Sequence, residues 1–269
     1  MNDASVGIFD SGMGGLTVMR ALMARLPRER FLYLGDTARL PYGTKSPDTV
    51  TRYSVQAASV LVKRRIKLLV VACNTASGVA LPALQEAFAP LPVIDVIAPG
   101  AEAALAASPR GPIAVIATEG TVKAGAYLRA IHARAPDVVV TQTQCPLFVP
   151  LAEEGLVDGE IVELVAHRYL DPVLARKPHA LVLGCTHYPA LKATIAKVAG
   201  PDVVLVDSAE TTAIRVEQRL HEMDLLRSAA AKPEHRFLST DAPERFARVG
   251  EIFLGRRIDP EAVELVDLQ

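Results

Sequence analysis

Two short segments of similar pattern constrain the fold of this chain most. In each, a continuous apolar run ends in a cysteine followed by small polar residues: residues 68–72 precede Cys73, and residues 180–184 precede Cys185. An unbroken apolar run of this length is typical of a strand buried on both faces of a parallel sheet. The sequence therefore predicts two buried strands, each of which presents a thiol at its carboxyl end.

These two segments belong to a wider repeat. Cys185 follows Cys73 by 112 positions, and Asp207 follows Asp95 by the same 112, each aspartate lying at the end of an apolar strand-like run. Two matches at one offset indicate a structural duplication. Strand-like and helix-like segments also alternate along the chain, which is the pattern of α/β units with parallel sheets and right-handed crossovers.

The alternation predicts where the elements lie. Helices are expected from the first glycine-rich loop to residue 25, from Ser46 to residue 63, after the Cys73 strand, over about 158–174 and from residue 243. Ser46 and the proline after it supply a capping hydroxyl and a first-turn proline. Strands are expected near residues 6–9, 31–34, 68–72, 92–96, 112–117, 137–140, 180–184, 203–206, 236–240 and 263–266.

We therefore expect an α/β fold of two pseudo-symmetric lobes, each a mostly parallel sheet flanked by helices. The first lobe is expected to comprise residues 1–97 with 212–269, and the second residues 98–211. Ligands of parallel sheets bind beyond the carboxyl ends of the strands, so the site is expected in the cleft between the lobes. Candidate residues at predicted strand ends are Asp10, Asp36, Cys73, Thr118 and Cys185.

Composition excludes several classes of function. The 269 residues include 29 basic and 30 acidic side chains, so no basic field is available for nucleic-acid binding. The basic run at residues 63–67 is expected to be a solvated helix end. Three cysteines, an odd number, argue against a disulfide framework. With no signal-peptide pattern and no apolar run near ~20 residues, we expect a cytoplasmic protein with free thiols and no membrane association.

The two cysteines can be interpreted as structural residues or as reactive ones. Cysteine is commonly a small, buried, inert side chain. Cys73 and Cys185, however, both precede an apparent helix start, where the dipole and free amides favour a thiolate. A thiol that titrates near ~8.5 then needs only modest tuning to act as a general base. A redox pair or metal site is the alternative, but no CxxC spacing and no second histidine at ligand spacing supports it.

Residues 10–15, Asp-Ser-Gly-Met-Gly-Gly, form a glycine-rich strand-to-helix turn. The turn matches a phosphate-binding loop poorly and lacks the lysine of a P-loop. It is either a tight turn that needs glycine or a place where amides and Ser11 hold a substrate carboxylate. In the second case, Asp10 could hold an ammonium group or modulate a thiol.

Other polar residues have a structural explanation beside a functional one. His187 could orient or protonate a group near the Cys185 sulfur, although a lone histidine is more often structural. Glu153 is expected on a solvated helix face, and helix capping alone explains Thr118 and Thr121. The third cysteine, Cys145, precedes a proline in an apolar segment and is assigned to the core.

Several segments match the motifs of one known family. They are residues 10–12 (Asp-Ser-Gly), 35–37 (Gly-Asp-Thr), 41–43 (Pro-Tyr-Gly), 72–76 (Ala-Cys-Asn-Thr-Ala), 145–155 (Cys-Pro-Leu-Phe-Val-Pro-Leu-Ala-Glu-Glu-Gly) and 184–189 (Gly-Cys-Thr-His-Tyr-Pro). Together they resemble the glutamate racemases, within the aspartate/glutamate racemase superfamily. The resemblance runs in chain order over about residues 6–213.

The resemblance implies an isomerase that interconverts L- and D-glutamate without a cofactor or metal, the D form entering peptidoglycan synthesis. It implies that Cys73 removes the α-proton from D-glutamate and Cys185 from L-glutamate, with the substrate between two lobes. A homodimer is a family-level expectation. The acids implied beside Cys73 are Asp10 and Asp36, and those implied beside Cys185 are Glu153 and His187.

The resemblance also implies a set of substrate-binding positions, and the chain departs from the family pattern beside one of them. Glu119-Gly120 and Lys123-Ala124 are unusual next to a threonine-rich carboxylate-binding turn, because a carboxylate there is unfavourable unless it points away. The implied binding residues are Asp10, Ser11, Pro41, Tyr42, Gly43, Asn74, Thr75, Thr118, Thr121, Thr186 and His187.

Racemisation explains why two thiols are present. A proton must leave one face of the α-carbon and another must arrive on the opposite face, which two facing thiols achieve without movement across the substrate. Three alternatives stay open: an aspartate racemase of the same superfamily, a two-lobed amino-acid-binding module without catalysis, and a regulator acting through protein contacts. Binding alone has no need of sulfur on both sides, and no basic patch or tail supports the third.

Overall fold

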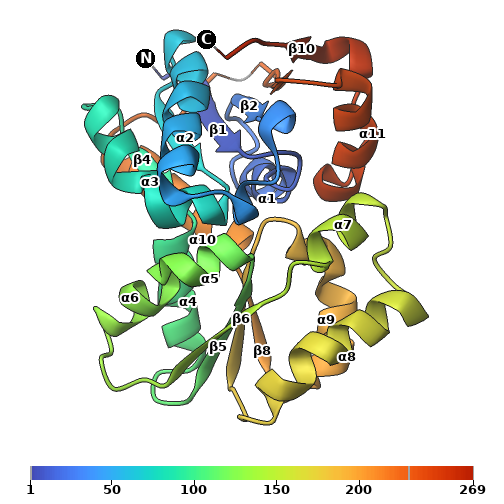
Figure 1. Cartoon of the computed structure of the whole chain (residues 1–269). Helices are drawn as coiled ribbons and strands as arrows, with labels where there is room; N and C mark the ends of the chain where they lie inside the picture. Colours follow the sequence, from blue (N-terminus) through green and yellow to red (C-terminus); the bar gives the residue numbers. More distant parts are fainter. Residues whose placement is uncertain (1, 230, 269) are drawn as a thin grey trace.

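The computed structural model describes residues 2–229 and 231–268 and contains two separate parallel sheets, one in each lobe (Figure 1). The first sheet has the strand order β10-β9-β2-β1-β3-β4. Its strands are β1 (Val6–Asp10), β2 (Phe31–Gly35), β3 (Leu68–Val71), β4 (Val93–Asp95), β9 (Arg236–Ser239) and β10 (Val263–Leu265). Every neighbouring pair in it is parallel.

The second sheet repeats part of the first. Its order is β6-β5-β7-β8, which is the order of β2-β1-β3-β4. Its parallel strands are β5 (Ile113–Ala117), β6 (Val140–Gln144), β7 (Ala180–Gly184) and β8 (Val204–Asp207). Strands β3 and β7 thus occupy equivalent places, and Cys73 and Cys185 follow them. The expected two-lobed α/β fold is confirmed, whereas the residue limits of the lobes stay a prediction.

Helices cover both faces of each sheet (Figure 1). The α-helices are α1 (Leu16–Arg25), α2 (Pro47–Lys63), α3 (Asn74–Ala87), α4 (Ile97–Ala107), α5 (Glu119–Ala124), α6 (Ala126–His132), α7 (Phe148–Glu153), α8 (Glu160–Leu174), α9 (Lys192–Ala199), α10 (Ser208–Glu222) and α11 (Pro243–Leu254). Short 3-10 turns are η1 (Thr37–Arg39), η2 (Tyr42–Thr44), η3 (Tyr188–Leu191) and η4 (Pro260–Ala262). Ser46 caps α2 as predicted, since its hydroxyl accepts the Thr49 N–H at 3.3 Å.

Side chains that alternate between the two faces of the first sheet divide the core into two parts. Along β3, Leu68 and Val70 pack into a large core that continues into the second lobe, whereas Leu69 and Val71 pack on the opposite face of the sheet. This alternation is the two-residue period of a strand. Because one core joins the two lobes, their strand ends are held at a fixed separation.

The C-terminal segment returns to the first lobe. Strand β9 pairs with β2 in parallel, β10 extends the same edge, and α11 packs against α1. In Figure 1 helix α11 descends beside this sheet and reaches α7 of the second lobe, with which it is in contact. In the described part of the chain, no helix is both long and apolar enough to cross a membrane.

Two expectations from the sequence are wrong in detail. The strand expected over residues 137–140 is β6, Val140–Gln144, at an edge of the second sheet. An edge strand with half-exposed residues needs no apolar run, and the apolar Val139 is exposed while Val138 packs into the core before the strand begins. The basic run at residues 63–67 is not wholly solvated, because its last residue, Lys67, is buried.

Lys67 lies in a buried polar network of the first lobe. Its ammonium group is 2.6 Å from the Glu29 carboxylate, and the two side chains are only 1% and 2% exposed. It also donates to the backbone carbonyls of Asn2 and Leu225 at 2.8 Å each. The second oxygen of Glu29 accepts the Arg227 N–H at 2.7 Å. The network therefore ties the N-terminal residues to the segment that follows α10.

Glu29→Gln should lower the free energy of unfolding by about 3–5 kcal/mol, because it leaves the Lys67 charge buried without its partner. Chemical denaturation followed by circular dichroism measures this change. Glu217→Gln is the matched control: Glu217 pairs with Arg25 at the surface, where side chains are 37% and 41% exposed, and should cost about 1 kcal/mol or less. Equal losses in both variants would contradict the assignment.

Candidate active site

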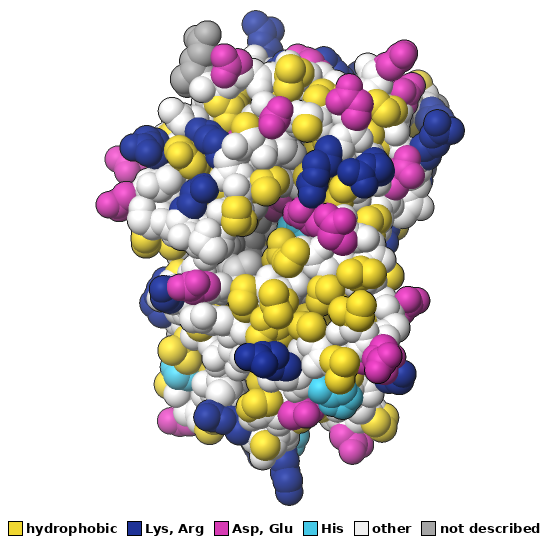
Figure 2. Space-filling model, turned by 45° about the vertical axis from the view of Figure 1, so that its right-hand side comes forward, with side chains coloured by type: hydrophobic (Ala, Val, Ile, Leu, Met, Phe, Trp, Pro, Cys, Tyr) yellow, Lys and Arg dark blue, Asp and Glu magenta, His cyan; other side chains and the backbone are white. Residues whose placement is uncertain are grey.

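A cavity of about 330 Å³ lies where the two lobes meet. The face of the molecule in Figure 2 is hollowed at this junction, with hydrophobic side chains along its lower rim. The carboxyl ends of β3 and β7 deliver residues to it, as expected for parallel sheets. Its lining residues are Ser11, Gly12, Leu40, Pro41, Tyr42, Gly43, Thr44, Cys73, Asn74, Thr75, Thr118, Glu119, Pro146, Val149, Pro150, Glu153, Cys185, Thr186 and His187.

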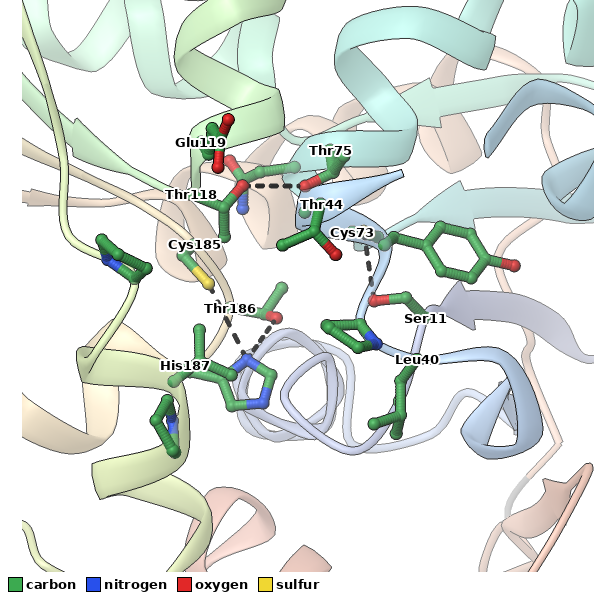
Figure 3. Close-up of a pocket in the computed structure, with 18 of the residues that line it drawn as sticks. Ser11, Leu40, Thr44, Cys73, Thr75, Thr118, Glu119, Cys185, Thr186 and His187 are labelled. Carbon is green, nitrogen blue, oxygen red and sulfur yellow. Dashed lines mark hydrogen bonds between the residues drawn. The ribbon is translucent and has the colours of Figure 1, made fainter. Parts of the chain in front are cut away.

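The two predicted thiols share this cavity. Figure 3 shows Cys185 on one side of it and Cys73 on the other, with Thr186 and His187 below Cys185. Both cysteines are free and almost fully buried, so their sulfur atoms meet solvent only through the cavity. A small molecule in the cavity therefore has a thiol on each side.

Cys73 occupies the cap position of α3. Its sulfur accepts the Ala76 N–H at 3.4 Å and its thiol donates to the Ser11 hydroxyl at 3.4 Å. Burial nevertheless raises the pKa of Cys73 to about 12, and the nearby Asp10 carboxylate acts in the same direction. The expectation that the helix start favours a thiolate here is therefore wrong, because burial and Asp10 outweigh the helix amides.

Cys185 has a different environment, made by a chain of charged groups. Its sulfur lies 3.8 Å from His187 Nδ1, and His187 Nε2 lies 3.1 Å from Glu153 Oε1. The other carboxylate oxygen, Oε2, accepts from Arg245 Nη2 at 3.2 Å. Glu153 is thus largely buried, and each of its carboxylate oxygens has a hydrogen-bond partner. It does not lie on the solvated helix face that was expected.

The series of charged contacts from Arg245 through Glu153 to His187 keeps the imidazole protonated. Burial by itself lowers the pKa of His187, but its hydrogen bonds to the Cys185 sulfur and the Glu153 carboxylate outweigh burial and raise the pKa to about 10. Burial also opposes ionisation of Glu153, yet His187 and Arg245 together lower the pKa of its carboxyl. The positive charge of this imidazolium thus lies beside the Cys185 sulfur.

Asp10 lies behind the cavity wall rather than in it. It is fully buried, its Oδ2 accepts the Gly12 N–H at 3.0 Å, and its Oδ1 has no hydrogen-bond partner. Burial raises the pKa of Asp10. In this position Asp10 raises the pKa of Cys73 through its charge. Its carboxylate does not reach the cavity surface, so it has no direct contact to offer a substrate ammonium group.

Asp36 is also fully buried and does not line the cavity. Its carboxylate accepts hydrogen bonds from the Tyr42 hydroxyl, from Arg39 Nε at 2.7 Å and from the Thr240 hydroxyl at 3.0 Å. Tyr42 does line the cavity. Asp36 is therefore placed to hold the loop around Tyr42 in position.

The hydroxyls of Thr75, Thr118 and Thr121 form a triangle, and Figure 3 shows the first two on the side of the cavity above the thiols. Thr75 and Thr118 are 3.0 Å apart, Thr118 and Thr121 2.9 Å, and Thr75 and Thr121 3.2 Å. Thr121 is fully buried beneath the other two. The unusual Glu119 is ion-paired with Lys123 and partly exposed, and Figure 3 shows its carboxylate on the far side of Thr118 from the thiols.

Asn74 supplies a free donor. Its Oδ1 accepts from the Tyr127 hydroxyl at 2.8 Å, while its Nδ2 is buried without a hydrogen-bond partner. Because Asn74 lines the cavity and its orientation is fixed by Tyr127, the amide N–H groups are available to an acceptor on a ligand.

Glycines let the lobes approach closely around the cavity. A Cβ at Gly14 would overlap the His187 ring and the Thr186 hydroxyl, and Thr17 donates to the Thr186 carbonyl at 3.0 Å. On the other side, a Cβ at Gly43 would lie 2.9 Å from Thr118 Cβ. The glycine-rich loop at residues 10–15 thus serves a close contact between lobes.

Most residues predicted for the site are brought together, and three are not on its surface: Asp10, Asp36 and Thr121. Arg245 and Tyr127 were not predicted, and no motif signals them. Cys145 is buried in the core and does not line the cavity. Within residues 2–229 and 231–268, no group of three or more His, Cys, Asp or Glu side chains is arranged to hold a metal ion. The predicted lining residues that the cavity contains are Ser11, Pro41, Tyr42, Gly43, Cys73, Asn74, Thr75, Thr118, Glu153, Cys185, Thr186 and His187.

Comparisons with known proteins agree on one family. The family model for Asp/Glu/hydantoin racemases matches residues 13–216. A glutamate racemase from Geobacter metallireducens is 52% identical over 254 residues, which cover 94% of each chain. The match includes both strands that carry the thiols.

Solved structures give the same result over both lobes. A crystal structure of glutamate racemase from Francisella tularensis in complex with D-glutamate has a TM-score of 0.92 and 41% identity, covering 100% of this chain and 99% of that one. A glutamate racemase isoform from Bacillus anthracis has a TM-score of 0.94 and 38% identity, with coverage of 100% and 99%.

The protonation of His187 can be measured directly. In ¹⁵N-histidine NMR spectra at pH 7, both ring nitrogens of His187 should carry protons, and the ring should lose one only near pH 10. Glu153→Gln should lower that pKa by removing an anionic partner. His235, whose pKa burial and nearby cations lower to about 4, is the internal reference for a neutral ring. A neutral His187 in the unmodified protein at pH 7 would contradict a protonated imidazole held by this series of charged contacts.

Proposed function

The chain belongs to the Asp/Glu/hydantoin racemase family and is an isomerase, and from that premise we propose that it interconverts L- and D-glutamate through Cys73 and Cys185. One thiolate removes the α-proton from one face of the substrate. The other thiol delivers a proton to the opposite face. Neither metal nor cofactor is used in this proposal.

One observation carries the proposal: two thiols line a single cavity of about 330 Å³ from opposite lobes. The volume suits one small ligand. The relatives support glutamate as that ligand, since a structure with a TM-score of 0.92 is a complex with D-glutamate. A binding module without catalysis leaves the second thiol unexplained.

The environments of the two thiols support a direction for the first proton transfer. With His187 as an imidazolium beside its sulfur, Cys185 is assigned the role of the base for L-glutamate, and Cys73, whose pKa burial raises to about 12, is assigned the role of the proton donor. Cys185 then takes the α-proton from L-glutamate, and Cys73 gives its proton to the opposite face to form D-glutamate. The reverse reaction starts from the other protonation state.

The charge that forms during proton removal spreads onto the α-carboxylate. The donors that we assign to it are the Thr186 hydroxyl and the unpaired Nδ2 of Asn74, which belong to residues that line the cavity. Each positioned acid or base contributes about 10²–10⁴-fold to the rate. A donor aimed at developing charge in a water-poor site contributes about 10²–10³-fold more. Racemisation by this route therefore needs both kinds of group.

The remaining predicted residues have supporting roles in this proposal. Thr75 and Thr118, with Thr121 behind them, bind a substrate carboxylate, and Ser11 with the loop of Pro41, Tyr42 and Gly43 closes the cavity. Asp10 acts on the Cys73 thiol through its charge, and Asp36 holds Tyr42. We further propose that the D-glutamate is used for peptidoglycan in the cytoplasm, while a homodimer stays a prediction.

Incubation with L-glutamate in heavy water should give D-glutamate with deuterium at the α-carbon, because the incoming proton comes from a solvent-exchanged thiol. Chiral chromatography with mass spectrometry measures the product. Cys73→Ala and Cys185→Ala should each reduce racemisation by at least about 10²-fold. Cys145→Ala is the matched control and should keep activity, since that thiol lies in the core. Full activity in either cavity variant would rule out the two-thiol mechanism.

Substrate choice separates glutamate from aspartate racemisation. We expect kcat/KM for L-glutamate to exceed that for L-aspartate by at least about 10-fold, because the shorter side chain cannot reach its carboxylate-binding groups while the α-carbon lies between the thiols. Polarimetry with each amino acid gives both constants. A preference for aspartate would favour the alternative racemase, and absence of turnover with both would favour a binding module.

A further inference from the structure

We propose that Arg245 of α11 is a positioning residue for the Cys185 thiol, acting through Glu153 and His187. The inference rests on the proposed function, in which Cys185 exchanges a proton with the substrate. It assigns a task in the site to the C-terminal part of the chain, which carries no family motif in its sequence.

The contact between α11 and the second lobe is specific. Helix α11 belongs to the first lobe by its packing on α1 and ends beside α7 and η3 of the second (Figure 1). From it, Arg245 donates to Glu153, and Phe253 places its ring 5.0 Å from the His187 ring in an edge-to-face arrangement. One helix thus fixes both the carboxylate and the imidazole.

Charges alternate along the chain of contacts. The cationic Arg245 meets the anionic Glu153, which meets the imidazolium of His187, which meets the Cys185 sulfur. Each carboxylate oxygen of Glu153 has one partner, Oε2 to Arg245 and Oε1 to His187. Loss of the guanidinium frees the carboxylate to turn toward solvent, and the imidazolium then loses its fixed orientation toward the sulfur.

Cys73 is not reached by such a series of charged contacts among the described residues. The groups around it are the Ser11 hydroxyl, the Ala76 N–H and the buried Asp10 carboxylate, and none of them is a cation. The effect of Arg245 should therefore be confined to one of the two thiols. Arg245 itself does not line the cavity, so substrate contacts should stay as they are.

Alkylation of the free enzyme by iodoacetamide at pH 7 tests this inference without substrate, because only the thiolate reacts. The rate at each cysteine is read from peptide mass spectra. Arg245→Gln should slow alkylation of Cys185 by about 2- to 5-fold, the change expected from a half-exposed ion pair, and leave Cys73 unchanged. Arg245→Lys should restore part of the loss. Arg248→Gln, an exposed arginine on the same helix, should change neither rate.

The outcomes are distinct. A slower reaction at Cys185 alone supports the inference, and a parallel drop in kcat with KM nearly unchanged strengthens it. Unchanged rates at both cysteines overturn it, as do increased rates at both, which would mean that Arg245 only keeps the lobes closed. These results do not depend on racemase activity of the unmodified enzyme, whose absence would instead overturn the proposed function.

Discussion

The parallel arrangement of the strands is the constraint on which the rest of this structure depends. In a parallel sheet all strands end at the same edge, so a cysteine after β3 and a cysteine after β7 each reach the rim of a sheet. The shared strand order of the two sheets puts these rims in equivalent places, and the core that joins the lobes fixes their separation. The cavity between the thiols follows from duplication and packing.

The two halves are similar in backbone but different in charge. Cys73 faces hydroxyl and amide groups with a buried carboxylate behind it, whereas Cys185 faces an imidazolium supported by Glu153 and Arg245. The mechanism that we propose uses such a difference, because it assigns the role of base to one thiol and the role of proton donor to the other. The same residues also explain the glycines of the first loop, because His187 occupies the space that a Cβ at Gly14 would need.

Sequence patterns predicted what depends on local order along the chain. The strands, the duplication and the two thiols follow from apolar runs with polar ends, and most of the cavity lining follows from motifs. Features that depend on distant packing were not predictable: Lys67 pairs with Glu29 across the lobe, and Arg245 meets Glu153 across 92 positions. The raised pKa of Cys73 is of the same kind, because burial and the Asp10 charge exist only in the folded chain.

A crystal structure of this chain with glutamate bound would show whether the two thiols face one α-carbon. We expect the α-carbon between the two sulfur atoms, with Cys73 Sγ and Cys185 Sγ on opposite faces and each within about 3–4 Å of it. Both sulfur atoms on the same face of the α-carbon, or one of them turned away from the ligand, would contradict racemisation by two thiols.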